Sequence, residues 1–309
     1  MFAVLFPGQG SQSVGMAKEL YDKYDLVKKI FQNADKSLGY SISKIILEGD
    51  QNKLNLTEHT QPAIFVVSYS IFSVIKSEFN INLNKAKFFA GHSLGEYSAL
   101  ACAGAISFDN AITLLSKRGK SMQSAVPIGV GGMIAILGKE VEFIENILSS
   151  SDYESCQIAN DNCPGQVVVS GKLTMINKLN DFLKKESIKS ILLPVSALFH
   201  CNLMSKSTDI MKIEIEKTDF RTPQPKIISN VNATDQDDKE LIKSLLIKQI
   251  ESRVEWRKSI NFMIKEGIKQ FIEIGPGKVL SGLIKRIDRS LKVSTINKEE
   301  DIKLININD

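Results

Sequence analysis

The sequence contains few residues that could hold a metal ion. Its 309 residues include only four cysteines and three histidines. The cysteines occur singly, without a Cys-x-x-Cys pair, and the histidines lack the spacing of zinc ligands. We therefore expect no metal site, and the scattered cysteines favour a reducing compartment, the cytoplasm.

Long apolar runs and a strong net charge are also missing. No apolar run reaches the roughly 18 residues of a membrane-spanning helix, and the opening MFAVLFPGQG lacks the basic region of a signal peptide. The 39 basic and 35 acidic residues leave a net charge of +4, too small to indicate nucleic-acid binding. With 43% hydrophobic and 24% charged residues, the composition predicts one large globular domain, or a main and a smaller domain.

Strand-like and helix-like segments alternate along much of the chain. Strands are predicted at 2–6, 86–90, 226–229 and 270–274, and helices over 60–79, 94–105, 108–125, 238–251, 256–266 and 277–290. This alternation favours an α/β fold with a mostly parallel sheet.

The middle of the chain has a different order, β-α-β-β-α-β, which is the ferredoxin-like motif. Its strands are predicted at 133–137, 155–160, 166–170 and 189–195, and its helices at 141–150 and 173–185. We expect residues 126–195 to form a small domain inserted into a large one made of 1–125 and 196–309. A cleft is expected between the two domains.

A possible nucleophile lies in GHSLG (91–95), which fits the pattern G-x-S-x-G. Between a strand and a helix, both predicted here, this pattern forms a sharp turn with no room for Cβ atoms beside the serine. Ser93 is therefore a candidate nucleophile, and the backbone N–H of Leu94 could face a developing negative charge. The alternative is that Ser93 only caps the following helix.

Three histidines could supply a base for Ser93. His92 adjoins the serine, so its side chain should point away and orient the turn, and His59 lies in the polar stretch TEHTQP, expected to be a loop. His200 follows the inserted domain, where the chain returns to the cleft, and is the favoured base. It could instead cap the next helix, and the adjacent Cys201 is expected to be a small packed residue.

Arg118 lies on an apolar helix face. Apolar residues recur around it at intervals of three and four, at Ala111, Leu114, Leu115 and Met122. A guanidinium on a buried face needs a partner. A substrate, a structural salt bridge and a snorkelling side chain all remain possible.

The glycine-rich GQGSQS (8–13) is not expected to bind a nucleotide. It lacks the third glycine of a dinucleotide fingerprint and the Lys-Ser/Thr of a Walker motif.

The chain resembles the malonyl-CoA:acyl carrier protein transacylases over essentially its whole length. The similarity lies in nine ordered blocks, which are FPGQGSQSVGM (6–16), TQPAIF (60–65), GHSLGEYSAL (91–100), KRGKSMQ (117–123), ANDNCPGQVVVSG (159–171), FHCNLM (199–204), SNVNA (229–233), QIESRVEW (249–256) and IEIGPGKVLSGLIKR (272–286). The family implies a hydrolase-like α/β core that carries a ferredoxin-like insertion.

The resemblance assigns catalytic roles to five residues. Ser93 would be the nucleophile and His200 its base, while the backbone carbonyl of Gln249 would hold the histidine ring in place of an acid. Without the family, Gln249 would be read as an exposed polar residue near a helix end. The backbone N–H groups of Gln9 and Leu94 would form the oxyanion hole.

The resemblance also assigns substrate contacts. Arg118 would bind the free carboxylate of the malonyl group through a planar, two-bond contact. Phe199 would limit the space at the malonyl α-carbon. Asn160 and Asn162 would line the cleft, although loop hydrogen bonding alone would explain them.

The implied function is malonyl transfer from malonyl-CoA to the phosphopantetheine thiol of acyl carrier protein, through a malonyl-serine, for fatty acid synthesis. The expected partners are acyl carrier protein and the CoA thioester, without nucleic acid, membrane, metal or cofactor, and the chain is expected to be a cytoplasmic monomer. A serine hydrolase and a non-catalytic carrier-protein binding module are the alternatives. Arg118 on a buried stripe argues against the first, and the intact Ser93, His200 and Arg118 argue against the second.

Overall fold

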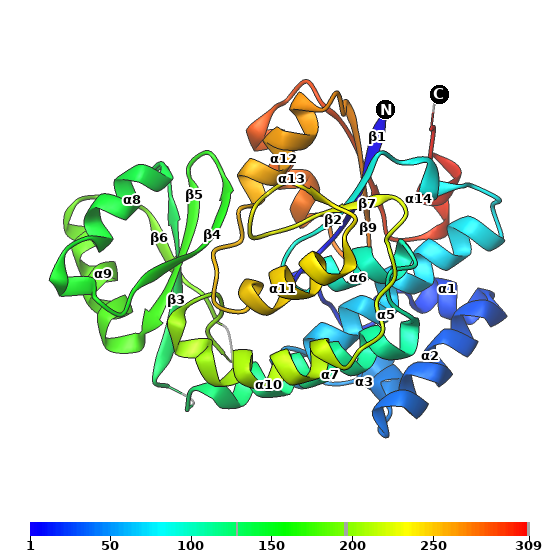
Figure 1. Cartoon of the computed structure of the whole chain (residues 1–309), viewed down its shortest axis with the longest axis horizontal. Coiled ribbons are helices and arrows are strands. Elements are labelled where there is room, and N and C mark those ends of the chain that lie inside the picture. Colours follow the sequence, from blue (N-terminus) through cyan, green and yellow to red (C-terminus); the bar gives the residue numbers. More distant parts are fainter. Residues whose placement is uncertain (128, 195–196, 308–309) are drawn as a thin grey trace.

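The computed structural model describes residues 1–127, 129–194 and 197–307. It has two sheets that lie in separate lobes (Figure 1), one with six strands and one with four. The predicted α/β class, with a mostly parallel core sheet and a separate ferredoxin-like unit, is confirmed.

The large sheet has the strand order β10-β9-β1-β2-β7-β8 and is parallel except for β8. Its strands are β1 (Phe2–Phe6), β2 (Phe88–Gly91), β7 (Lys226–Ile228), β8 (Asp235–Gln236), β9 (Gln270–Ile274) and β10 (Lys292–Ile296). The four predicted core strands are all present. The two outer strands, β8 and β10, were not predicted.

Helices cover both faces of this sheet. Their bounds are α1 Lys18–Lys23, α2 Asp25–Leu38, α3 Ile42–Glu48, α4 Gln51–Leu54, α5 Thr57–Ser77, α6 Gly95–Cys102, α7 Phe108–Ala125, α10 Ser205–Glu216, α11 Lys239–Gln249, α12 Trp256–Lys265, α13 Val279–Ile287 and α14 Glu299–Lys303. The six helices predicted outside the central segment are confirmed, but α5 begins at Thr57. The expectation of a loop at His59 is therefore wrong, because the N–H groups of His59 and Thr60 already bond to the carbonyl of Leu56.

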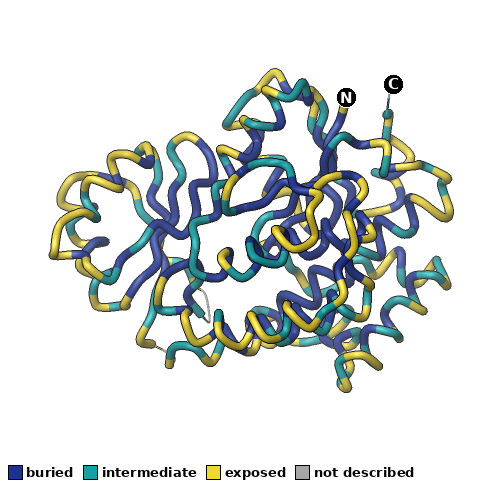
Figure 2. Tube along the Cα trace, in the orientation of Figure 1, coloured by how far each residue is buried: buried dark blue, intermediate teal, exposed yellow. Residues whose placement is uncertain are grey.

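The central strand β1 shows why both faces are covered. Its five residues are all buried and alternate between two core clusters: Phe2, Val4 and Phe6 face α5, α6 and α7, whereas Ala3 and Leu5 face α12 and α13. An uninterrupted apolar strand of this kind is typical of a sheet that is buried on both sides. Figure 2 shows the buried strands inside and the exposed helix faces outside. None of the described helices is long and apolar enough to cross a membrane.

The small sheet has the order β4-β5-β3-β6 and is antiparallel. It consists of β3 (Gly131–Leu137), β4 (Gln157–Cys163), β5 (Gln166–Lys172) and β6 (Ser190–Leu192), with helices α8 (Val141–Leu148) and α9 (Leu173–Lys185). On β3, Ile134 and Ile136 pack with these helices, while Met133 and Ala135 pack into the larger core. The small sheet is thus covered by its own helices on one face and by the large lobe on the other.

The division of the chain into domains stays a prediction. All elements of the small sheet lie within 131–192, inside the predicted range 126–195. The predicted boundary between 195 and 196, and the last residue of the strand predicted at 189–195, lie outside the described residues.

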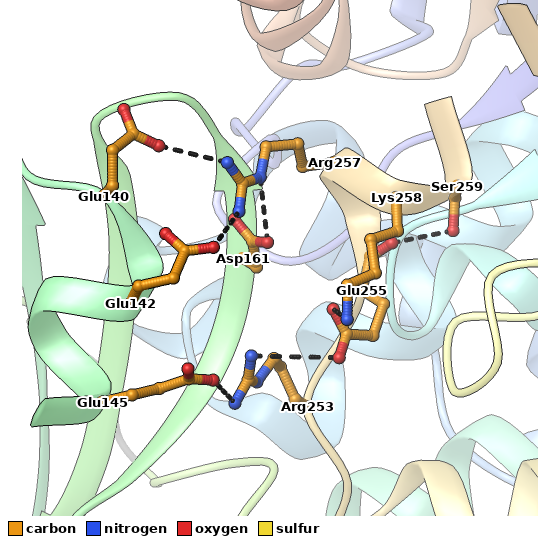
Figure 3. A network of polar contacts seen from close by, with 9 residues as sticks. All are labelled: Glu140, Glu142, Glu145, Asp161, Arg253, Glu255, Arg257, Lys258 and Ser259. Carbon is orange, nitrogen blue, oxygen red and sulfur yellow. Dashed lines mark hydrogen bonds and ion pairs between the residues drawn. The ribbon is translucent and has the colours of Figure 1, made fainter. Parts of the chain in front are cut away.

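A network of ion pairs joins the two lobes (Figure 3). At the start of α12, Arg257 places Nε 3.0 Å from the Asp161 carboxylate on β4, and Nη1 3.1 Å from that of Glu140. Arg253 lies 2.7 Å from Glu145 on α8. Close by, Val254 exchanges backbone hydrogen bonds with β4, donating to Ala159 and accepting from Asp161. The chain between α11 and α12 is therefore fastened to the small sheet.

Arg257→Ala should lower the free energy of unfolding by about 3 kcal/mol, because it leaves the Asp161 carboxylate buried without its cation. Urea unfolding measures the loss. The matched control is Lys258→Ala on the same helix, whose side chain is 59% exposed and pairs with Glu255. It should cost under about 1 kcal/mol, and equal losses for the two variants would contradict the role given to the Asp161 pair.

Candidate active site

Ser93 lies on a sharp turn between β2 and α6. Its φ of 53° is in the left-handed region, which few residues other than glycine adopt. A Cβ at Gly91 would come within 1.9 Å of the Gly95 backbone, and one at Gly95 within 2.2 Å of the Phe6 carbonyl oxygen. Both flanking positions therefore need glycine. The N-cap of α6 is Leu94, so the alternative that Ser93 caps this helix is wrong.

Asn230, in the loop after β7, braces the strained turn. Its side-chain oxygen accepts the Ser93 backbone N–H at 2.7 Å, and its side-chain nitrogen donates to the Gly91 carbonyl at 2.7 Å. Its own backbone N–H donates to Glu96 at 3.2 Å. Such bonds offset the cost of holding a non-glycine residue at positive φ.

His200 connects Ser93 to the end of α11. Its Nε2 lies 2.8 Å from Ser93 Oγ, and its Nδ1 lies 2.8 Å from the backbone carbonyl oxygen of Gln249. Since a carbonyl can only accept, Nδ1 carries the proton and Nε2 is free to accept the serine proton. Gln249 is the last residue of α11, where carbonyls have no partner within the helix. It is fully buried, so the expectation of an exposed Gln249 is wrong.

The histidine is held neutral by its surroundings. Burial, followed by the nearby Arg118 guanidinium, lowers the pKa of His200 to about 3. The residue is 2% exposed. His200 is therefore an unprotonated acceptor throughout the neutral range.

The side chain of Arg118 extends from α7 to Ser93 and Gln249. Its side chain donates from Nη1 to Gln61 Oε1 at 2.8 Å, and from Nη2 to Gln249 Oε1 at 2.9 Å and Ser93 Oγ at 3.2 Å. All three acceptors are uncharged, and the residue is only 1% exposed. Neither a structural salt bridge nor a snorkelling side chain describes this arrangement. Within the described part of the chain, its Nε has no hydrogen-bond partner.

Three residues of the site were not found from the sequence. Gln61 and Asn230 contact Arg118 and Ser93 directly. Glu96 accepts from Gln249 Nε2 at 2.7 Å, and burial raises the pKa of its carboxyl to about 7. Each lies in a block quoted above for the family resemblance, so the blocks were the available signal.

The two residues predicted to form an oxyanion hole lie on neighbouring loops. Leu94 begins α6, directly after Ser93. Gln9 follows β1, whose last residue, Phe6, pairs with Gly91 at the end of β2. The Gln9 side chain donates to Thr57 at 3.3 Å. The oxyanion role of both residues stays a prediction.

The other predicted residues lie around this centre. The half-buried Phe199 ring is 6.5 Å from the His200 ring, centroid to centroid. Asn162 contacts His92, with Oδ1 2.9 Å from Nε2, and Asn160 forms a bridge with Val254. The bridge at Asn160 is made by the backbone groups of its neighbours, Ala159 and Asp161. The contact of both asparagines with substrate stays a prediction.

The remaining histidines and Cys201 lie apart from the proton path. His92 packs its ring against Trp256, and His59 lies against Tyr40. Cys201 is fully buried, and burial raises the pKa of its thiol. In the described residues, no three His, Cys, Asp or Glu side chains are grouped as metal ligands.

A groove of about 560 Å³ opens onto His200. Gln157 and Ile158 of β4 line one side, and Glu251 and Arg253 line the other. The groove therefore lies between β4 of the small sheet and the segment that follows α11, with His200 in its lining.

Comparisons with known proteins identify the family to which the chain is similar. A family model described as the acyl transferase domain matches residues 3–303. The malonyl CoA-acyl carrier protein transacylase of Bacillus subtilis (strain 168) is 43% identical over 305 residues, which cover 98% of this chain and 95% of that protein.

Solved structures are similar as well. An acyl-carrier-protein S-malonyltransferase from Bartonella henselae superposes with a TM-score of 0.95 at 39% identity, covering 98% of this chain and 97% of that one. A malonyl-transacylase in complex with a type II PKS acyl-carrier protein has a TM-score of 0.93 at 37% identity, covering 98% and 97%.

Modification of Ser93 by phenylmethanesulfonyl fluoride, a neutral reagent, should proceed at a rate that is nearly constant between pH 5 and 8. The His200 imidazole is neutral over this whole range because its pKa is lowered to about 3, whereas an ordinary histidine titrates near 6.5. The rate is measured by intact-protein mass spectrometry, with circular dichroism to confirm folding at each pH. An inflection near pH 6.5 would contradict the depressed pKa.

Proposed function

Because this chain belongs to the acyl transferase domain family, we propose that Ser93, His200 and Arg118 together perform its malonyl transfer. The chain has acyl-carrier-protein S-malonyltransferase activity: it moves the malonyl group of malonyl-CoA to acyl carrier protein for fatty acid synthesis. The observation that carries the assignment of residues is the meeting of serine, histidine and guanidinium within hydrogen-bond distance.

In the first step, Ser93 Oγ attacks the thioester carbonyl while His200 Nε2 takes the serine proton. The backbone N–H groups of Leu94 and Gln9 stabilise the tetrahedral oxyanion. The bond between carbon and sulfur then breaks, and His200 returns the proton to the CoA thiolate. The product of this step is a malonyl ester on Ser93.

In the second step, the phosphopantetheine thiol of acyl carrier protein attacks that ester. His200 takes the thiol proton and passes it to Ser93 Oγ as the ester bond breaks. The groove beside Gln157 and Arg253 admits the long pantetheine arm in both steps. The same residues thus act twice, in opposite directions.

Arg118 selects the acyl group. Its Nε has no hydrogen-bond partner among the described residues, and its Nη2 lies beside Ser93 Oγ, so the guanidinium presents a buried cation where the free malonyl carboxylate would lie. A guanidinium binds a carboxylate through two parallel hydrogen bonds. Phe199, beside His200, limits the space for a substituent on the malonyl α-carbon. A serine hydrolase that used water would have no need of this cation.

We propose the cellular location of the protein from its cysteines. The four cysteines are free and buried, which suits the reducing cytoplasm. The chain acts there as a monomer on soluble thioesters.

Incubation with malonyl-CoA alone should place one malonyl group on Ser93, because the transfer to serine precedes the second substrate. Peptide mass spectrometry should locate the adduct on the peptide that contains Ser93. Ser93→Ala is the control and should show none. Labelling that persists in this variant, or that lies on Cys201, would refute the assignment of the nucleophile.

Arg118→Ala should reduce transfer from malonyl-CoA by roughly 30- to 1,000-fold, since a charge-assisted contact of two bonds contributes on the order of 2–4 kcal/mol. Transfer from acetyl-CoA, which has no carboxylate, should stay level or rise. Arg118→Lys should recover only part of the loss, because an ammonium cannot form the planar contact.

The ratio of malonyl to acetyl transfer serves as the internal control for folding in this experiment. A misfolded variant loses both activities together. An equal fall for both substrates in a folded Arg118→Ala would show that the arginine is structural.

A further inference from the structure

Among the residues that the structure describes, the buried guanidinium of Arg118 has no direct anionic partner. Its acceptors are the side-chain oxygens of Gln61 and Gln249 and the hydroxyl of Ser93. A buried charge is costly unless an opposite charge or well-placed dipoles offset it. Some other group must therefore balance Arg118 when no substrate is bound.

Glu96 is connected to Arg118 through one amide. Its carboxylate, on the first turn of α6 and 2% exposed, accepts from Gln249 Nε2 at 2.7 Å. The other end of that amide, Oε1, accepts from Arg118 Nη2 at 2.9 Å. The amide dipole thus has its positive end toward the acid and its negative end toward the guanidinium. This is the orientation that transmits the stabilisation of an ion pair.

We propose that Glu96 is the counter-ion of Arg118 in the empty site, and that it weakens the hold of the site on an acyl group that carries a carboxylate. It is a positioning residue, since it acts through Gln249 and does not touch the substrate. The inference rests on the proposed function, in which Arg118 binds the malonyl carboxylate. Bound malonyl then meets a guanidinium whose charge Glu96 already offsets in part. Weaker binding of the malonyl group favours its onward transfer. An interaction that is equally strong in the ground state and in the transition state does not raise the turnover rate.

The charge of Glu96 changes within the working range of pH. The titratable groups around it are Arg118 on α7, Tyr97 on α6, and the two histidines of the turn and cleft, His92 and His200. Burial raises the pKa of Tyr97 to about 12 and lowers that of both histidines, to about 3 for His200. Arg118 stays charged, although burial lowers its pKa from 12.5. Between pH 6 and 8.5, Glu96 is thus the group of this set that titrates, from neutral to anionic, with a pKa of about 7.

The test is the concentration of malonyl-CoA that half-saturates Ser93 acylation, measured by rapid mixing and intact-protein mass spectrometry. In the wild type it should rise by about threefold or more between pH 6 and 8.5, as Glu96 becomes an anion. In Glu96→Gln it should stay at the low value across this range. The half-saturating concentration of acetyl-CoA should change neither with pH nor with the substitution. Because both thioesters carry the same CoA phosphates, the comparison corrects for the titration of those phosphates.

Glu273→Gln is the matched control. This carboxylate on β9 is also buried and accepts from the start of α13, at Leu280 and Ser281, away from Arg118. Its substitution should lower stability but leave the malonyl-CoA profile of the wild type. A structural role for Glu96 would make the two variants alike.

The outcomes distinguish a failure of the proposed function from a failure of the counter-ion role of Glu96. If the wild type is not malonylated on Ser93, the proposed function fails. If it is, and Glu96→Gln has the wild-type profile, the counter-ion inference alone is wrong. Should Glu96→Gln not fold, the wild-type profiles decide: equal pH dependence for malonyl-CoA and acetyl-CoA overturns the inference.

Discussion

Gln249 joins the groups of the site through both its backbone and its side chain. Its backbone carbonyl holds His200, and its side-chain amide contacts Arg118, Glu96 and the carbonyl of Ser93. The last carbonyls of a helix have no partner within the helix, so the end of α11 supplies an acceptor without a carboxylate. This end also has the negative pole of the helix dipole, which favours a positive charge on His200 during proton transfer. A shift of this one residue would displace the base and the guanidinium together.

A neutral acceptor at this position has an electrostatic consequence. A carboxylate beside His200 would lie close to Arg118 and would repel the malonyl carboxylate, whereas a carbonyl leaves the guanidinium free for substrate. The cost is a low basicity of His200, because burial and then Arg118 lower its pKa and no carboxylate offsets them. On the proposed binding mode, the malonyl carboxylate pairs with Arg118 and offsets its charge. The correct substrate therefore raises the basicity of His200, which an acyl group without a carboxylate cannot do.

The sequence predicted those parts of the fold that depend on local periodicity. The order of the four-stranded unit and most of the large sheet follow from strands and helices whose apolar residues repeat regularly. The edge strand β10, KVSTI, was missed because it is only partly buried and lacks a continuous apolar pattern. Ser93 could be found from its glycines. The contacts of Gln61, Glu96 and Asn230 could not, because they join segments far apart in the chain and leave no local pattern.

The two lobes contribute different parts of the reaction centre. Ser93 and Arg118 lie on elements that pack on the large sheet, at the ends of β2 and within α7. The segment of His200 is tied to the small sheet, since the carbonyl of Phe199 accepts from Ser170 on β5 and the N–H of Asn202 donates to Gln157 on β4.

The segment that follows Gln249 is tied to the same sheet by the backbone of Val254 and by the Arg257 network (Figure 3). The segments of the base and of its orienting carbonyl are thus both tied to the small sheet, whereas Ser93 lies at the end of a strand of the large sheet. Gln249 links the two lobes, because its backbone carbonyl holds His200 and its side chain bonds to the carbonyl of Ser93. A change in the angle between the lobes would therefore disturb the contact between Ser93 and His200 together with these bonds. The ion pairs that join the lobes therefore do more than add stability, because they fix the one distance on which proton transfer from Ser93 depends.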